Sequence, residues 1–163
     1  MSENSWTIYT DGSSQGKRIQ YKDGWLCERG GYASIIVRGG TVIKKLYQGF
    51  KRTTNNRCEL FGVLEGLKYF KTPQTITIYS DSQYVISSIV NGHAKKWFEQ
   101  QDFSKKNLDL WHDIIDLIEF HNVEFQWVKG HSDNEYNELC DKLAVHAAQC
   151  LNLPEDNEYT NRI

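Results

Sequence analysis

The sequence has almost no net charge, no long hydrophobic run and no closely spaced cysteine pair, and each absence excludes a class of protein. Lysine and arginine total 19 against 21 aspartates and glutamates, which gives a formal charge of −2. A broad surface that coats a polyanion is therefore not expected, so any polyanion must be bound by a local patch. No apolar run approaches the roughly 20 residues that a membrane-spanning helix needs.

Signals for secretion and for disulfide or zinc chemistry are also missing. The first residues, 1–4, contain neither the basic region nor the apolar region of a signal peptide, so we expect a cytoplasmic protein. The four cysteines, Cys27, Cys58, Cys140 and Cys150, form no C-x-x-C pair. We expect reduced and mostly buried thiols. Cys58 and Cys140 directly precede acidic residues, but adjacent helical residues point about 100° apart, so shared metal binding is not indicated.

What the sequence does contain is the composition of a folded protein. Hydrophobic residues make up 39% and charged residues 25% of the 163 positions, a balance typical of globular proteins. This length suits one domain with a substantial core. We expect that domain to span residues 1–151, followed by a polar and loose tail over 152–163.

The spacing of hydrophobic residues predicts an α/β fold with a five-stranded mixed sheet flanked by helices. Strands are expected over 5–10, 32–37, 42–49, 75–80 and 123–128, and helices over 56–71, 82–90, 95–101, 108–120 and 135–151. The polar stretch 12–31 is expected to be a long hairpin connection. Three adjacent strands followed by strands that alternate with helices indicate antiparallel pairing first and parallel pairing later.

Four acidic residues stand where these elements could bring them to one point. Asp11 and Asp81 each follow a predicted strand, and parallel strands place ligands beyond their carboxyl ends. Glu59 lies on the helix face that should turn toward the sheet, and Asp141 lies in the last helix. Carboxylates gathered in this way repel one another unless they hold cations. The first hypothesis is therefore metal-assisted phosphoryl chemistry.

Each of these acids also has an ordinary explanation. Asp11, which precedes a glycine, could be a turn residue, and Asp81 could cap the following helix. Glu59 could be a first-turn glutamate favoured by the helix dipole. Asp141 could be an acid on a helix surface. It is the conjunction of all four that favours a metal site.

Longer motifs around these acids resemble ribonuclease H of type 1. They are Asp11-Gly12-Ser13, Thr53-Thr54-Asn55-Asn56-Arg57 with Glu59-Leu60, the run 77–85, Trp127-Val128-Lys129-Gly130-His131, and Asn137-Glu138 with Cys140-Asp141. They follow the family's order from about Trp6 to Leu151. The resemblance implies a ribonuclease H-like fold and a catalytic domain over 1–151. It also implies hydrolysis of the RNA strand of an RNA–DNA hybrid within the strand, which leaves 5′-phosphate and 3′-hydroxyl ends.

The same resemblance implies a catalytic set. Asp11, Glu59, Asp81 and Asp141 would be the metal ligands, and His131 would be an auxiliary catalytic residue on a polar loop. Two Mg²⁺ ions about 4 Å apart suit this hydrolysis, with Mn²⁺ as an alternative. A titratable imidazole could relay protons or help a product leave. A surface histidine without a role is the alternative for His131.

Three of five candidate substrate contacts resemble positions of the family, and the other two follow from their place at a helix start. Asn55, Asn56 and Gln83 match positions at the minor groove of the hybrid, where amides can bind base edges and 2′-hydroxyls. Thr54 and Arg57 stand at a predicted helix start, which favours anions, and could hold phosphates.

The stretch 93–106 combines basic and aromatic residues, among them Lys95, Lys96 and Trp97. It resembles the family's basic protrusion, although it is shorter and carries acids, and it suits contact with the DNA strand. The alternative is a solvated charged helix with one packed aromatic. Substrate binding should be weak and salt-sensitive.

One segment departs from the family pattern, and two other functions remain open. Residues 14–30 replace a short Gly- and Pro-rich turn that family members often carry, so contacts from that turn are not carried over. Junction resolvases and integrase-like cores share this architecture, but their motifs match less closely. A nucleic-acid-binding module without turnover is the other alternative, against which the four intact acids argue. A monomer that binds RNA–DNA hybrid and no membrane is expected.

Overall fold

Helices alternate with strands only after the first three strands of the chain, as the sequence predicts. The computed structural model describes residues 5–21, 24–100, 107–129 and 134–156. In chain order the elements are β1 Ser5–Tyr21, β2 Gly24–Arg38, β3 Thr41–Thr53, α1 Asn55–Lys68, β4 Thr75–Ser80, α2 Gln83–Val90, α3 His93–Gln100, α4 Leu108–Phe120, β5 Asn122–Trp127 and α5 Glu135–Gln149. The predicted helices therefore exist, with ends shifted by at most three residues.

Within the described residues, the five strands form one mixed sheet in the order β3-β2-β1-β4-β5. The pairs β1–β2 and β2–β3 are antiparallel, whereas β1–β4 and β4–β5 are parallel. This arrangement confirms the predicted fold class. The sequence of β4 shows why it forms an inner strand: Ile76 and Ile78 are buried and alternate with threonines, which suits a pleated strand.

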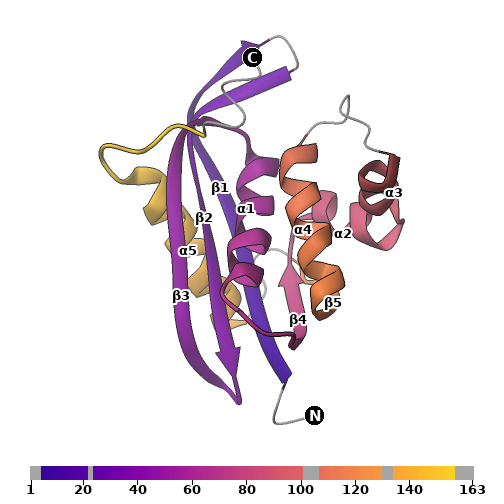
Figure 1. Cartoon of the computed structure of the whole chain (residues 1–163). Helices are drawn as coiled ribbons and strands as arrows, with labels where there is room; N and C mark the ends of the chain where they lie inside the picture. Colours follow the sequence, from indigo (N-terminus) through magenta and orange to yellow (C-terminus); the bar gives the residue numbers. More distant parts are fainter. Residues whose placement is uncertain (1–4, 22–23, 101–106, 130–133, 157–163) are drawn as a thin grey trace.

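The two faces of the sheet carry separate hydrophobic cores. Ile8 belongs to the core formed with residues of α1, β4, α2 and α4, whereas its neighbour Tyr9 belongs to the core formed with residues of α5 on the opposite face. Successive strand residues point to opposite faces, so β1 serves both cores. In Figure 1 the α5 helix (yellow) covers one side of the sheet, and α1 and α4 cover the other.

The segment expected to be a long hairpin connection is instead a continuation of two strands. Backbone pairing between β1 and β2 runs from Thr7↔Val37 outward to Tyr21↔Gly24, with a register shift between Gln15 and Arg18. Figure 1 shows this arm bending away from the rest of the sheet. Polar residues and glycines concealed the strands, because solvent-exposed antiparallel strands need no buried face.

Helix α1 lies close against β1 because two of its residues lack side chains. A Cβ atom on Gly66 would lie 3.0 Å from Ile8 Cγ2, and one on Gly62 would lie 3.3 Å from Thr10 Cβ. The Ser34 hydroxyl donates a hydrogen bond to the Gly62 carbonyl. The helix begins after Thr54, whose side chain accepts a hydrogen bond from the Arg57 amide at 3.1 Å. The cap and the glycines together fix where α1 starts and how deeply it sits.

The expectation of a loose tail is wrong for residues 153–156. Leu153 is buried, and the Lys51 amide donates a 2.8 Å hydrogen bond to the Pro154 carbonyl. Glu155 forms a parallel bridge with Lys51, and Asp156 is buried. A polar composition concealed this docking, because the contacts are hydrogen bonds and ion pairs.

All four cysteines are free, in agreement with the predicted reduced state. Cys58 and Cys140 are buried, Cys27 is partly buried and Cys150 is exposed. The predicted burial is therefore confirmed for only part of the set. Burial raises the pKa of the Cys58 and Cys140 thiols well above their usual value, so neither offers a thiolate to a metal. None of the described helices is long and apolar enough to cross a membrane.

Candidate active site

Parallel pairing of β1 and β4 brings the first two acids together. The register pairs Tyr9 with Tyr79, so Asp11 and Asp81 stand two residues further along neighbouring strands. Asp11 is not a turn residue, because β1 continues through it and pairs it with Ala33. Asp81 is not the cap of α2 either, since the Ser82 side chain accepts the hydrogen bond from the Val85 amide.

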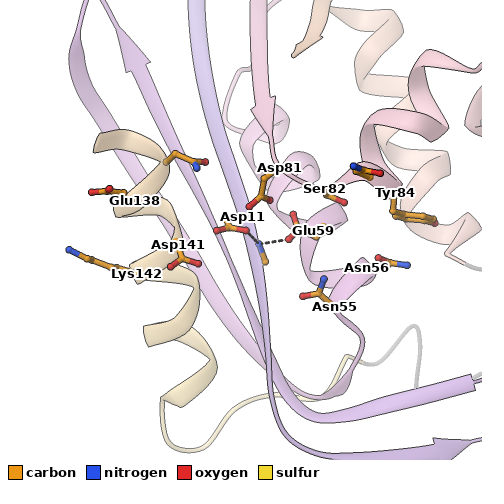
Figure 2. Close-up of a pocket in the computed structure, with 13 residues that line it drawn as sticks. Asp11, Asn55, Asn56, Glu59, Asp81, Ser82, Tyr84, Glu138, Asp141 and Lys142 are labelled. Carbon is orange, nitrogen blue, oxygen red and sulfur yellow. Dashed lines mark hydrogen bonds between the residues drawn. The ribbon is translucent and has the colours of Figure 1, made fainter. Parts of the chain in front are cut away.

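Glu59 reaches the same point from α1. The helix starts at Asn55, so Glu59 lies beyond the first turn, where the dipole explanation no longer applies. One backbone amide, that of Gly12, donates to Asp11 Oδ1 at 2.8 Å and to Glu59 Oε1 at 3.0 Å. Figure 2 shows Asp11, Glu59 and Asp81 turned toward one another from three separate elements.

The three carboxylates form a tight and poorly solvated cluster. Ligand oxygens of Asp11, Glu59 and Asp81 lie within 4.8 Å of one another, and the first two residues are each 4% exposed. Burial, then the charge of Asp81, raise the pKa of Asp11 to about 8. Burial and the charges of Asp11 and Asp81 raise the pKa of Glu59 well above its ordinary value. The site disfavours its own negative charge unless a cation is present.

Asp141 approaches this cluster from the opposite face of the sheet. It projects from α5, is exposed and lines the same cavity as the three buried acids. Figure 2 shows its side chain reaching toward Asp11. A hydrogen bond and the charge of Asp141 both contribute to the raised pKa of Asp11. The structure thus gathers all four predicted acids around one cavity, with Asp141 at its edge.

The donor set fits divalent cations. Glu59 Oε2 is buried and has no hydrogen-bond partner among the described residues. An unpaired buried carboxylate oxygen is costly, and a cation would satisfy it. Carboxylate oxygens are also the ligands that Mg²⁺ and other hard cations prefer. Asp11, Glu59 and Asp81 could therefore bind such an ion directly, with Asp141 available from the cavity edge.

The cavity around the acids has a volume of about 530 Å³ and a polar rim. Asn55, Asn56 and Gln83, which the sequence predicts as substrate contacts, all line it. All three side chains are exposed. Their amides could therefore donate and accept hydrogen bonds at the mouth of the cavity.

The prediction that Arg57 holds a phosphate does not agree with the structure. Its side chain is 1% exposed and forms ion pairs with Asp109 at 2.9 Å and Asp156 at 2.6 Å. The guanidinium is therefore turned into the protein, away from an incoming ligand. The Thr54 hydroxyl accepts the hydrogen bond that caps α1, and Thr54 does not line the cavity.

Residues of the predicted basic protrusion lie outside the cavity. Lys95 and Lys96 are exposed on α3, and Lys95 Nζ lies 4.0 Å from Glu99. Trp97 on α3 is partly buried and packs against the larger core, as the alternative of a packed aromatic expected. Residues 101–106, the rest of this stretch, lie outside the described residues, as does His131.

Several cavity residues were not predicted as site residues. Tyr84, Asn137, Glu138 and Lys142 line the wall, and Gly12 supplies the shared amide. Asn137 and Glu138 precede Asp141 by four and three residues, so helix geometry places them on its face. That spacing was a usable signal. The role of Gly12 depends on a backbone amide, which a sequence pattern does not display.

Comparisons with known proteins agree with this geometry. The family model for RNase H matches residues 3–149. The chain is 42% identical over 158 residues to a ribonuclease H of Trichodesmium erythraeum, with 94% of each chain covered. It is 43% identical over 155 residues to a ribonuclease H of Desulforamulus reducens, with 92% of this chain and 91% of the relative covered.

Solved structures share the fold at low sequence identity. LC9-RNase H1, described as a type 1 RNase H with the type 2 active-site motif, superposes with a TM-score of 0.75 at 24% identity, covering 91% of this chain and 74% of its own. A foamy viral protease-reverse transcriptase in complex with RNA/DNA hybrid gives 0.69 at 19% identity, over 90% of this chain and 20% of its own. With a family match over most of its length and close relatives that cover it almost end to end, the chain belongs to the RNase H family and is a ribonuclease H enzyme.

Proposed function

We propose that this enzyme cuts the RNA strand of RNA–DNA hybrids internally, with two divalent cations, and leaves 5′-phosphate and 3′-hydroxyl ends. The observation that carries the proposal is the set of three carboxylates from β1, α1 and the end of β4 within 4.8 Å of one another. Membership of the RNase H family supports a nucleic-acid substrate and divalent metal use. The number of ions, the metal and the product ends are the proposed part.

The residues would divide the work of binding the cations. Asp11 is central, because it lies beside Asp81, Glu59 and Asp141. Asp11, Glu59 and Asp81 would hold the cations from the inner part of the cavity, and Asp141 would hold them from its exposed side. When bound, two Mg²⁺ ions would supply an activated water and charge stabilisation at the scissile phosphate, and Mn²⁺ would substitute. We propose His131 as an auxiliary group that carries protons or helps product release.

The Gly12 amide would organise the buried acids before substrate arrives. It donates to Asp11 and Glu59 at once, which fixes one oxygen of each at a set separation. The remaining oxygen of Glu59 is buried and accepts no hydrogen bond from the described residues, so it is available to a cation. A preorganised ligand set lowers the cost of ordering the side chains when cations and substrate bind.

Substrate recognition would use the polar rim. Asn55 and Asn56 at the start of α1 and Gln83 at the start of α2 flank the cavity. Their amides would bind base edges and 2′-hydroxyls in the minor groove, which distinguishes an RNA strand from DNA. Lys95 and Lys96, which are exposed on α3, would contact the DNA strand further away.

We further propose that the enzyme works as a monomer in the cytoplasm, with the domain over residues 1–151 carrying catalysis. All four proposed metal ligands come from one chain, so a second copy is not needed to complete the site. Light scattering combined with size-exclusion chromatography would test this state. A dimer at working concentration would contradict it.

The decisive experiment compares three labelled substrates: RNA–DNA hybrid, duplex RNA and duplex DNA, each with Mg²⁺, with Mn²⁺ and with chelator. Cutting confined to the RNA strand of the hybrid, and only with metal, is expected. End analysis should find 5′-phosphates and 3′-hydroxyls. Cutting of branched or duplex DNA would indicate a resolvase-like enzyme. Hybrid binding without cutting under every metal condition would indicate a binding module.

A further inference from the structure

The carboxyl-terminal segment 153–156 runs along the end of β3 and is held to it at successive residues. A Cβ atom on Gly49 would lie 2.9 Å from Leu153 Cδ2, which shows how closely the buried Leu153 sits on β3. The Lys51 amide donates to the Pro154 carbonyl, and Arg52 forms two hydrogen bonds to Glu155 at 2.8 and 3.1 Å. Asp156, the last described residue of this segment, lies beside the junction of β3 and α1.

Asp156 ties both sides of that junction together. Its Oδ2 accepts hydrogen bonds from the Thr53 hydroxyl at 2.9 Å and from Arg57 Nε at 2.6 Å. Its Oδ1 accepts from Arg57 Nη2 at 3.0 Å. The side chains of Asp156 and Arg57 are 2% and 1% exposed, so this bidentate pair is shielded from water. Thr53 ends β3, and Arg57 lies in the first turn of α1.

The backbone directly before the first anchor, Thr53, is in a conformation that is unfavourable by itself. Arg52 has a φ of 46°, a left-handed conformation that a residue with a side chain seldom adopts. Asn55 and Asn56 follow directly after the helix cap and line the cavity. The only residues between the anchors are Thr54 and these two asparagines. A restraint on Thr53 and Arg57 is therefore a restraint on where both amides point.

A second branch of the same network reaches another wall of the cavity. Arg57 also binds Asp109 at 2.9 Å and Asn107 at 3.3 Å. Asn107 Nδ2 in turn donates to the Tyr84 hydroxyl at 3.2 Å, and Tyr84 lines the cavity. The buried Arg57 guanidinium thus links the carboxyl-terminal segment to both walls that face the substrate.

We propose that Asp156 is a positioning residue for the substrate: by clamping Thr53 and Arg57 it sets the orientation of Asn55 and Asn56 at the cavity rim. The inference rests on the proposed function of that cavity as the hybrid-binding site. Glu59 has its own anchor, the Gly12 amide. Loss of the clamp should therefore weaken substrate binding more than it affects the metal-dependent step.

The test is steady-state cleavage of RNA–DNA hybrid by Asp156→Asn, at temperatures well below the unfolding midpoint of the variant. KM should rise about 5- to 10-fold, as expected for the loss of one or two side-chain hydrogen bonds to substrate. The kcat and the Mg²⁺ concentration for half-maximal rate should stay near wild type. Asp156→Glu keeps the carboxylate and should restore part of the KM. Glu65→Gln removes a carboxylate from the exposed pair with Lys68 on α1 and is the matched control.

A double-mutant cycle separates positioning from general stability. In the Asn55→Ala, Asn56→Ala background, Asp156→Asn should change KM by less than about twofold, because its effect passes through those amides. Should Asp156→Asn not fold, Thr53→Val removes only the hydroxyl that donates to Asp156 and should raise KM to a smaller extent. An unchanged KM in the folded variants, or fully additive effects in the cycle, would overturn the inference.

Failure of the inference and failure of the proposed function give different results. Absence of hybrid cleavage by the wild-type protein would contradict the proposed function. A wild-type protein that cleaves it, together with variants that lose only thermal stability, leaves that function intact and reduces Asp156 to a structural residue.

Discussion

At the scale of single residues, the site depends on carboxylates that are costly to charge without a cation. Asp11 and Glu59 are almost completely buried, and Asp81 adds a third charge to the cluster. In the absence of metal this cluster resists full ionisation, as the raised pKa values indicate. The binding of a cation and the loss of protons from these carboxyl groups are therefore coupled.

Replacing Asp81 by asparagine should remove cleavage while the fold remains. The asparagine amide keeps the size of the side chain but removes the negative charge of a metal ligand. Even the mutation of a residue that only hydrogen-bonds a metal ligand lowers metal affinity or activity by about 10–100-fold. We expect a loss of more than about 100-fold in hybrid cleavage with Mg²⁺. The measurement is a cleavage time course beside a circular dichroism spectrum. Cleavage near the wild-type rate would remove Asp81 from the catalytic set.

Replacing His131 by alanine should slow turnover without abolishing it. General acid–base groups typically contribute about 10²–10⁴-fold, and an auxiliary group should lie at the low end or below it. Single-turnover and multiple-turnover rates should both be measured. A larger effect on multiple turnover would indicate product release. Complete loss of single-turnover cleavage in a folded variant would contradict an auxiliary role.

At the scale of elements, the active site is a contact between β1 and α1 with very little space. A Cβ atom on Gly12 would lie 2.7 Å from the Glu59 amide nitrogen and 2.9 Å from the Cys58 carbonyl carbon. Both of these are backbone atoms of α1, so the strand and the helix would have to separate. Gly62 and Gly66 also keep the rest of the helix close to the sheet, although a Cβ atom there would meet its nearest neighbours at 3.2 and 3.0 Å.

Gly12→Ala should therefore reduce both stability and cleavage. Overpacking of this kind costs about 1–3 kcal/mol in the free energy of unfolding. The shift should also disturb the amide that serves Asp11 and Glu59, so the Mg²⁺ requirement should rise. Chemical denaturation and a Mg²⁺ titration of the rate measure the two effects. Wild-type stability with wild-type Mg²⁺ dependence would show that the contact is looser than the structure indicates.

The sequence predicted elements well where hydrophobic periodicity was present. The Ile76–Ile78 alternation located β4, and Pro73 marked the region where α1 ends. It failed for the outer part of the β1–β2 arm, which is held by backbone pairing. It also failed for residues 153–156, where hydrogen bonds and ion pairs add to the burial of a single apolar side chain, Leu153. Arg57 shows the same limit at the site: its motif position suggested a phosphate contact, but partners from residues 109 and 156 bury it.

At the scale of the whole molecule, stability should depend on pH through the buried acids. The folded pKa values of Asp11 and Glu59 are raised, that of Asp11 to about 8, mainly by burial. For an acid whose pKa is raised on folding, the protonated form is the favoured one in the folded state. Its stabilising contribution is complete below the unfolded pKa of about 4 and is lost as pH rises through the folded value.

Metal-free protein should therefore unfold at a lower temperature at pH 9 than at pH 6, and excess Mg²⁺ should remove most of the difference, because it binds only the folded, ionised site. Thermal melts with chelator and with Mg²⁺ at several pH values provide the measurement. Asp11→Asn should flatten the pH dependence of the chelated protein. A metal-free protein that becomes steadily more stable from pH 6 to pH 9 would contradict the assigned ionisation.

The position of β3 at the border of the sheet has a consequence for how the protein behaves in concentrated solution. A border strand offers unpaired backbone groups to which a strand of another molecule could add, which is a common route to aggregation. Here the exposed Lys44 and Lys45 place positive charge on that strand, and the Lys51 amide already donates its hydrogen bond to the Pro154 carbonyl. Molecules shortened at residue 152 should therefore self-associate more readily than the intact chain.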